Sequence, residues 1–332
     1  MAFQNLGKFQ QAAELALVKH GIGITHGVRL LQLSENATYL VYSRLSNEKY
    51  AVLRISRPGY HTMQELESEM AWLNEINDYT PLMVANPIPG KSGRIIQSIE
   101  LEGTTYFCVM FEFLEGKEPD SENEDIMIRQ FRILGETTAY LHRHTQIWNK
   151  TKQLHRMTWD YDTLIGAHAA FGNWRKAPEL QENPEGKKWI EQSCQVIQKR
   201  LEKYGKNEKN FGLIHADLRL SNILMEGEQI KVIDFDDCGF GWHLHDLASA
   251  VSFIEDKPIV TQLVNSWIKG YQKILPFTDT DLEEVDTFIV MRRIQLLAWL
   301  TSHFDSDPVK ELSIGYAEGT IKLAKRYIDY WG

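Results

Sequence analysis

The chain carries a short polar segment, His215-Ala216-Asp217-Leu218-Arg219-Leu220-Ser221-Asn222, and a second one farther along, Ile233-Asp234-Phe235-Asp236. Between them lie two apolar runs joined at Glu226-Gly227-Glu228, a pattern that predicts two short strands and a tight turn. Asp217 and Asn222 would flank the loop that enters one strand, and Asp234 would end the other strand. We therefore expect their carboxyl and amide groups to converge at one end of a rigid hairpin.

These residue types suit phosphoryl transfer. The reaction needs one carboxylate to accept the proton of the attacking hydroxyl, and a carboxylate with an amide oxygen to hold Mg²⁺ against the phosphates. Oxygen ligands fit such a hard cation, whereas a set of cysteines or histidines would not. The spacing of His215, Asp217 and Asn222 also fits the catalytic loop of kinases, H-x-D-L-x-x-x-N.

The same segments resemble the signature of the aminoglycoside phosphotransferase family, which includes choline kinase-like and type II homoserine kinase-like enzymes. The family pattern, H-G-D-x-H-x-x-N-I-L followed by I-D-F-x-D, stands here as HADLRLSNIL and IDFDD. The resemblance implies that Asp217 is the catalytic base and that Asn222 and Asp234 bind Mg²⁺. It also implies a structural role for Asp246 and a nucleotide, ATP or GTP, as phosphate donor.

Three positions depart from the family pattern. Ala216 replaces the usual glycine, Arg219 a common histidine and Leu220 a common proline. Arg219 lies two residues after the expected base, where serine/threonine protein kinases often carry lysine. We therefore hypothesise that Arg219 is catalytic and neutralises charge on the transferring phosphoryl group.

Hydrophobic periodicity divides the chain into two parts. The first part predicts a helix over 9–20, strands over 28–33, 37–45 and 50–56, a helix over 62–76, and strands over 94–99 and 105–114. After a polar linker we expect helices at 126–144, 184–204, 257–274, 280–302 and 310–329. The fold class is therefore α+β, and the resemblance implies a two-lobed protein-kinase-like fold. A small antiparallel, β-rich nucleotide-binding lobe would span 1–114, and a larger helical lobe with the catalytic loop and substrate site would span 115–332.

The resemblance also implies nucleotide-binding residues in the first lobe. Arg54 lies where kinases place the strand lysine that pairs with nucleotide phosphates, and Val52, on the same strand face, would line the adenine pocket. Glu69, on the next helix, is placed like the acidic partner of that cation. Asn36 matches a family asparagine in the turn that covers the phosphates. The alternatives are a plain surface pair for Arg54 and Glu69 and an ordinary turn residue for Asn36.

The segment Cys108–Gly116 resembles the hinge of this fold. Backbone groups near Glu112, Phe113 and Leu114 would contact adenine there. Because such contacts are largely made by the backbone, the sequence leaves the choice between ATP and GTP open.

Bulk composition excludes several classes of protein. The 332 residues include 36 basic and 45 acidic ones, and the net charge of −9 argues against general nucleic-acid or anionic-membrane binding. The three cysteines match no metal motif, and we expect free thiols in a cytoplasmic protein. We find no signal peptide and no apolar run long enough to cross a membrane. The sequence does not indicate the oligomeric state.

The prediction that follows is a magnesium-dependent phosphotransferase that uses ATP or GTP and acts on a hydroxyl of a small molecule. Plausible acceptors are amino alcohols, such as homoserine, hydroxylysine, choline or ethanolamine, or an aminoglycoside. A protein kinase is the alternative, but no APE-type activation segment follows Asp234. A non-catalytic nucleotide-binding protein is a third possibility, which the intact base and metal ligands disfavour.

Histidines and aromatic residues give weaker signals. We interpret His243 and His245 as structural or substrate-facing, because no metalloprotease spacing is present. His142 and His144 would meet the dipole at a helix C-terminus. Substrate contacts from the C-terminal helices are assigned to Trp299, His303, Phe304 and Asp305.

Overall fold

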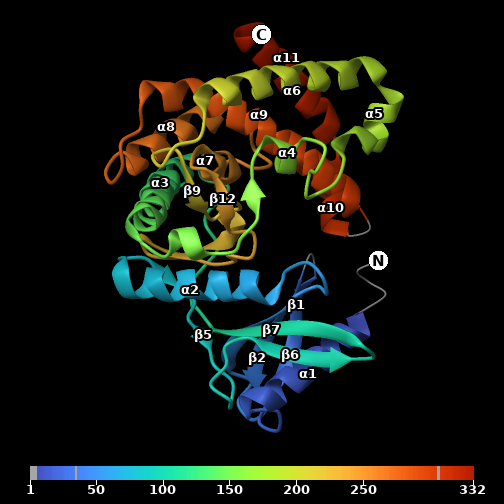
Figure 1. Cartoon of the computed structure of the whole chain (residues 1–332), viewed down its shortest axis with the longest axis vertical. Coiled ribbons are helices and arrows are strands. Elements are labelled where there is room, and N and C mark those ends of the chain that lie inside the picture. The colour runs from blue at the N-terminus through green and yellow to red at the C-terminus, as the bar shows by residue number, and fades with distance from the viewer. Residues whose placement is uncertain (1–5, 34–35, 305–306) are drawn as a thin grey trace. The chain divides into compact units, whose positions relative to one another are not determined.

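The computed structural model describes residues 6–33, 36–304 and 307–332. The chain divides into two compact units. The N-terminal unit comprises Met1–Gly116 with two later segments, Gln153–Arg156 and Lys231–Ile233, and the C-terminal unit comprises the rest. The first unit is rich in strands and the second is mostly helical, which confirms the expected α+β class (Figure 1).

A six-stranded antiparallel sheet forms the N-terminal unit. Its path runs β1-β2-β3-β7-β5, and β6 pairs with β7. The register of β3 on β7 places Val52 opposite Phe111 and Arg54 opposite Val109. The bounds are β1 His26–Leu33, β2 Ala37–Ser43, β3 Lys49–Ile55, β5 Pro87–Ile88, β6 Gln97–Leu101 and β7 Thr104–Glu112. The short strand β4, Met83–Val84, pairs instead in parallel with Lys231 and Val232 at the end of β11.

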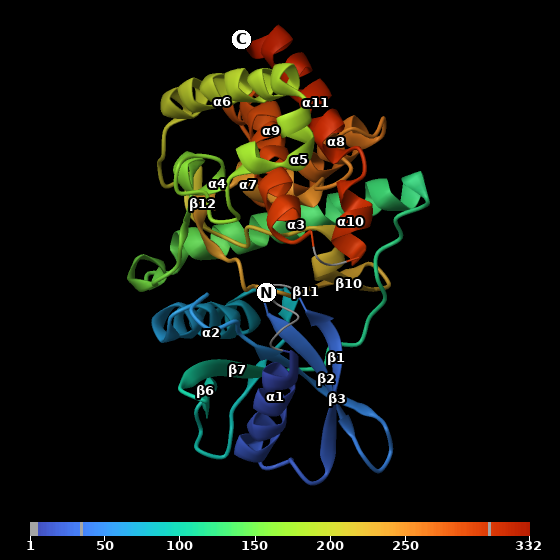
Figure 2. The ribbon, with the colours of Figure 1, turned by 90° about the vertical axis from the view of Figure 1, so that its right-hand side faces the viewer.

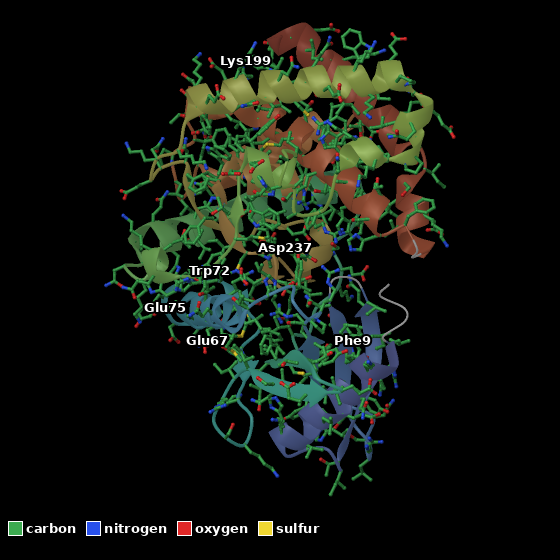
Figure 3. All side chains as sticks on the ribbon, turned by 45° about the vertical axis from the view of Figure 1, so that its right-hand side comes forward. Phe9, Glu67, Trp72, Glu75, Lys199 and Asp237 are labelled. Atoms are coloured by element: carbon green, nitrogen blue, oxygen red, sulfur yellow. The ribbon has the colours of Figure 1, made fainter. Side chains whose placement is uncertain are left out.

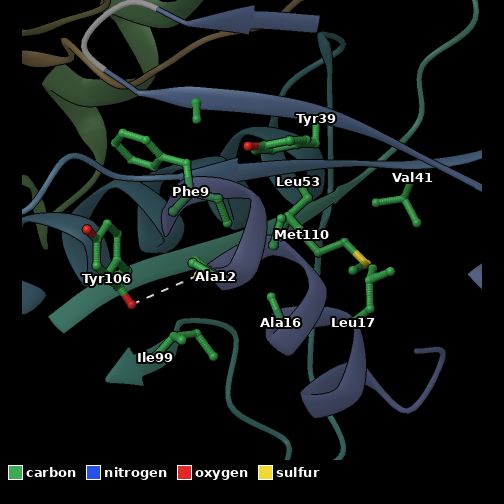
Figure 4. Packing of buried hydrophobic residues seen from close by; sticks show 14 of the residues in the cluster. Phe9, Ala12, Ala16, Leu17, Tyr39, Val41, Leu53, Ile99, Tyr106 and Met110 are labelled. Carbon is green, nitrogen blue, oxygen red and sulfur yellow. Dashed lines mark hydrogen bonds between the residues drawn. The ribbon is translucent and has the colours of Figure 1, made fainter. Parts of the chain in front are cut away.

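Helix α1, Leu6–His20, covers one face of this sheet. Phe9, Ala12, Ala16 and Leu17 of the helix pack against strand residues such as Leu53 (Figure 4). The small alanines let the helix lie close to the sheet, and alternate strand residues point into the same core. The opposite sheet face therefore carries Val52 and Arg54.

Helix α2, Met63–Tyr79, begins at a capping box. The Thr62 hydroxyl accepts a hydrogen bond from the Glu65 amide, and the Glu65 carboxylate accepts one from the Thr62 amide. The expected apolar stripe, Leu66, Met70, Leu73 and Ile76, is buried. The buried face of α2 also carries Glu69 and Trp72, of which Trp72 is labelled in Figure 3.

The C-terminal unit is built on long helices. Helix α3, Glu124–Ile147, packs against α8, Val260–Tyr271, at a crossing with a glycine on each side. A Cβ on Gly135 would overlap the Trp267 carbonyl oxygen, and one on Gly270 would overlap that of Arg132. These two glycines therefore permit the close approach of the two backbones.

Helices α6, Pro184–Tyr204, α9, Asp279–Ser302, and α11, Tyr316–Trp331, pack together in this unit (Figure 2). The expected single helix at 310–329 was wrong: α10, Asp307–Ser313, ends before Gly315, whose φ of 70° is left-handed. Periodicity also missed the short helices α4, Tyr161–Leu164, α5, Pro178–Glu182, and α7, Leu244–Ala250. Among the described residues, no helix is long and apolar enough to cross a membrane.

Short strands precede and follow the segment His215–Asn222. A three-stranded sheet, β8-β12-β9, is formed by Thr158–Trp159, Gly239–Trp242 and Phe211–Ile214. The segment His215–Asn222 leaves β9 and enters the predicted hairpin, β10, Ile223–Glu226, and β11, Gln229–Val232. Asp237, labelled in Figure 3, lies on the connection that follows β11.

Candidate active site

Asp217 lies at the centre of a hydrogen-bonded group in the C-terminal unit. The Nδ2 of Asn222 donates to the Asp217 backbone oxygen and to Oδ2, each at 2.8 Å. The Arg219 Nε donates to Oδ2 at 3.1 Å, and the Arg292 Nη2, from α9, donates to Oδ1. The Asp217 side chain remains 16% exposed. The carboxylate is therefore fixed in orientation but still reachable by a small acceptor.

Opposing effects set the charge of Asp217. Burial of the carboxyl acts to raise its pKa, but the positive charges of Arg219 and Arg292 outweigh burial and hold the pKa below its ordinary value. In the same way, the Asp217 carboxylate raises the pKa of Arg219, with smaller contributions from Asp234 and Asp237. Asp217 is thus ionised at neutral pH, as a hydrogen-bond acceptor for a hydroxyl must be.

The backbone before Asp217 has a left-handed conformation. Ala216 has a φ of 68°, which explains why glycine is usual at this position of the family pattern. The buried carboxylate of Asp246 holds this conformation by accepting the amides of His215 at 3.1 Å and Ala216 at 2.7 Å. The Ser249 hydroxyl donates to the Ala216 carbonyl at 2.9 Å. Asp246 is therefore connected to the loop through the structural contacts that the resemblance implied.

His142 extends this network into α3 and α8. Its Nε2 is 3.0 Å from the Asp246 Oδ2, and its Nδ1 is 2.9 Å from the Tyr271 hydroxyl. Burial lowers the pKa of His142 to about 3, so the ring is neutral. Helix α3 ends at Ile147, so of the two histidines expected at its C-terminus His144 lies in the last turn and His142 lies before it. Burial also lowers the pKa of His243 and of His245, so both rings are neutral. Two buried, neutral rings fit a structural role.

Asn222 and Asp234 offer oxygen atoms of the kind that Mg²⁺ prefers. Because the Asn222 Nδ2 is used by Asp217, its Oδ1 is the atom that can face a metal ion. Asp234 is exposed and has a left-handed φ of 61°. Within the described residues, no three His, Cys, Asp or Glu side chains form a metal-binding group. The donor set fits a hard cation that takes further oxygen ligands from nucleotide phosphates.

The N-terminal unit brings Arg54 and Glu69 into a buried, bidentate ion pair. The two contacts measure 2.8 Å and 2.7 Å, and Glu69 is fully buried. Arg54 also lies over the ring of Phe111, 5.4 Å from its centroid. The alternative of an ordinary surface pair was therefore wrong. Val52 lies on the same sheet face, half-buried.

The remaining nucleotide-binding candidates also lie in this unit. Asn36 is buried, and its Oδ1 accepts a hydrogen bond from the Arg57 amide at 3.3 Å, so it fixes the chain just after β3. The Glu112 amide donates to the Asn86 carbonyl at the end of β7. Phe113 and Leu114 follow the strand and are half-buried. The roles of these residues in nucleotide binding stay predictions.

Sequence reasoning missed Arg292. The signal was a pair of arginines, Arg292 and Arg293, inside a helix whose other residues are mostly apolar and buried. Of the expected aromatic substrate residues, Trp299 stacks on His303 with ring centroids 5.0 Å apart, and Phe304 is exposed. Asp305 lies outside the described residues.

Comparison with known proteins gives consistent matches over most of the chain. The profile of the phosphotransferase enzyme family matches residues 29–285. Amicoumacin kinase of Bacillus subtilis (strain 168) is 23% identical over 295 residues, which covers 86% of this chain and 82% of that protein. A solved microcompartment-associated aminopropanol kinase is 35% identical with a TM-score of 0.87, covering 97% of this chain and 98% of that one.

A more distant structure supports the protein-kinase-like fold alone. Spectinomycin phosphotransferase is 15% identical with a TM-score of 0.62 and covers 96% of this chain and 98% of that one. The family match and the aminopropanol kinase, by contrast, extend to the enzyme class. The chain therefore belongs to the phosphotransferase enzyme family, and it is a small-molecule kinase.

Proposed function

We propose that the enzyme transfers the γ-phosphoryl group of ATP, or of GTP, to the hydroxyl of a small amino alcohol, with Asp217 as the base. The observation that carries this proposal is the carboxylate of Asp217, held ionised and oriented by Arg219, Arg292 and Asn222. An acceptor hydroxyl donates to this carboxylate, and its oxygen attacks the γ-phosphorus. Little covalent chemistry falls to the protein, so positioning and charge neutralisation supply most of the catalysis.

Two sets of residues would bind the nucleotide and its metal ion. In the N-terminal unit we assign phosphate binding to Arg54, oriented by Glu69, with Asn36 in the covering turn. We assign the adenine contacts to Val52 and to the backbone after β7, at Glu112, Phe113 and Leu114. The fixed bidentate ion pair supports the role of Arg54, because it holds a guanidinium in one orientation.

In the C-terminal unit we assign metal binding to the Asn222 Oδ1 and to Asp234. A bound Mg²⁺ would supply neutralisation of the charge on the phosphates. Arg219, whose side chain is 29% exposed, is placed to reach a transferring phosphoryl group once it leaves Asp217. These assignments follow the oxygen chemistry of the donors and the local geometry of the loop.

The class of acceptor is inferred from three observations. A solved aminopropanol kinase is 35% identical over nearly the whole chain. Only Phe235–Cys238 separate Asp234 from β12, which leaves little length for the activation segment of a protein kinase. The net charge of −9 favours a cationic substrate.

The buried, free thiols of Cys108, Cys194 and Cys238 support a reducing, cytoplasmic location.

A coupled assay of nucleoside diphosphate release tests the acceptor and donor. The panel contains 1-amino-2-propanol, ethanolamine, choline, homoserine, hydroxylysine and an aminoglycoside, each with ATP and with GTP. We expect turnover with at least one amino alcohol and a phosphomonoester product in the ³¹P NMR spectrum. Turnover confined to the aminoglycoside, or diphosphate release that needs no acceptor, would contradict the proposal.

A further inference from the structure

The two arginines that contact Asp217 differ in how exposed their side chains are. Arg219 belongs to the loop itself, and its side chain is 29% exposed. Arg292 comes from the middle of α9, and its side chain is only 3% exposed. One of the two contacts to the carboxylate is thus set by a packed helix, whereas the other is made by a side chain at the surface of the site.

The guanidinium of Arg292 is fixed on all sides. Its Nε donates to the Ser252 hydroxyl at 3.3 Å, its Nη1 donates to the Gln295 Oε1 at 3.0 Å, and its Nη2 donates to the Asp217 Oδ1. Both Ser252 and Gln295 are buried. Because each nitrogen of the planar group faces a different partner, its orientation is determined before any substrate arrives.

The turn that contains Ser252 also contacts the other arginine. Phe253 has a left-handed φ of 69°, which is a strained conformation for a bulky residue. Its ring centroid lies 5.9 Å from the Arg219 guanidinium carbon, within the range of a cation–π contact. The ring also packs on Tyr316, with a centroid separation of 5.7 Å. One short turn, Ser252–Phe253, therefore contacts both arginines that bind Asp217.

These contacts decide which oxygen of Asp217 is available. A carboxylate oxygen accepts about two hydrogen bonds. The Oδ2 already accepts from Arg219 and from Asn222, whereas the Oδ1 accepts only from Arg292 among the hydrogen bonds of the described residues. The remaining lone pair of the carboxylate is therefore on Oδ1, the oxygen that Arg292 holds in place.

We propose that Arg292, held by the Ser252–Phe253 turn, is a positioning residue that presents the Asp217 Oδ1 to the acceptor hydroxyl. The inference rests on the proposed function of Asp217 as base. In the step itself, the acceptor oxygen bonds to the γ-phosphorus, and the bond from phosphorus to the bridging oxygen breaks, with its electron pair leaving on the nucleoside diphosphate. The hydroxyl proton passes to Oδ1.

Arg292→Ala is the first test, with Arg200→Ala as its control. Arg200, on α6, makes a part-buried ion pair at 2.9 Å with Glu284 of α9, the helix that carries Arg292. Among the described residues, none of the hydrogen bonds or ion pairs of Arg200 involves Asp217. A misplaced carboxylate costs about 100-fold in rate, so we expect Arg292→Ala to lower kcat about 100-fold while the nucleotide KM stays unchanged. Millimolar guanidinium should restore part of kcat. Arg200→Ala should lose stability but keep kcat.

Arg292→Lys covers the case in which the alanine variant does not fold. The lysine keeps the buried charge, but its ammonium cannot contact Ser252, Gln295 and Asp217 in the same geometry. We expect a folded enzyme with a kcat lowered roughly tenfold, a smaller loss than the one expected for Arg292→Ala. Ser252→Ala should also lower kcat, and this effect should vanish in the Arg292→Ala background, because Ser252 acts through Arg292.

The outcomes separate this inference from the proposed function. If Asp217→Asn is inactive but Arg292→Lys and Ser252→Ala turn over like the unaltered enzyme, Asp217 stands as base and the positioning role of Arg292 is wrong. If Asp217→Asn itself turns over normally, the proposed base is wrong and the inference falls with it. A kcat loss in Arg200→Ala equal to that in Arg292→Ala would also overturn it, since both would then reflect damage to α9.

Discussion

Replacing Asp246 with asparagine should loosen the loop that carries Asp217. Asp246 is fully buried and accepts three hydrogen bonds, from the amides of His215 and Ala216 and from His142. Asparagine would keep one acceptor oxygen, which can still bind the Ala216 amide. Its amino group would replace the other oxygen and face the two remaining donors.

The expected cost follows from which of these donors can adapt. His142 is neutral and can shift its ring proton from Nε2 to Nδ1, so that it accepts from the new amino group and donates to the Tyr271 hydroxyl. The His215 amide cannot adapt, and leaving this buried donor without an acceptor costs about 1–3 kcal/mol. We expect Asp246→Asn to lower the free energy of unfolding by about 1–3 kcal/mol.

Urea denaturation and steady-state kinetics check this prediction together. Ala216 should leave its left-handed conformation more often when the neighbouring His215 amide loses its hydrogen bond to residue 246, so kcat should fall with the stability. Ala216→Gly in the same background should restore part of kcat, since glycine adopts this conformation without strain. A loss of stability below about 0.5 kcal/mol, with unchanged kcat, would show that Asp246 does not hold the loop.

Three further predictions concern burial and packing. Burial lowers the pKa of His142 and His245 to about 3, below the unfolded value near 6.5, so their contribution to stability is complete above pH 6.5 and is lost as the pH falls. Each should cost about 1.4 kcal/mol at pH 5.5, and His245→Gln should remove its own share, about 1.4 kcal/mol, of the difference between the unfolding free energies measured with urea at pH 7.5 and at pH 5.5. Gly270→Ala should lower the free energy of unfolding by about 1–3 kcal/mol or more, because the new Cβ overlaps the α3 backbone; an unchanged urea midpoint would refute the close approach. Glu69→Gln should destabilise the fold by about 3–5 kcal/mol and raise the nucleotide KM, because Arg54 keeps a buried charge without its carboxylate partner; urea denaturation and nucleotide titration report these effects separately, and an unchanged KM would argue against Arg54 as the phosphate-binding residue.

Local sequence signals predicted the main elements of the fold. Leu66, Met70, Leu73 and Ile76 recur at helical spacing and are buried on α2, and the strands around Arg54 form the expected antiparallel sheet. The same local pattern missed the break at Gly315, since apolar residues continue on both sides of it. Periodicity reports which face is buried, but a backbone kink depends on φ at one residue.

Contacts between distant residues could not be predicted in this way. Arg292 lies 75 residues after Asp217 in the sequence, and no spacing rule connects the two positions. Ala216 departs from the family glycine, and only its φ shows that the position is left-handed. The pairing of Arg54 with Glu69 was predicted from a resemblance, because the strand and helix that carry them have fixed places in the kinase fold.

The most direct test of the central claim is the single-turnover rate of Asp217→Asn with an accepted amino alcohol. The variant keeps the size of the side chain but removes the carboxylate that receives the proton. A general base contributes about 10²–10⁴-fold, so we predict a fall in the rate of that order with nucleotide affinity unchanged. A rate within threefold of the unaltered enzyme would contradict the assignment of Asp217 as the base.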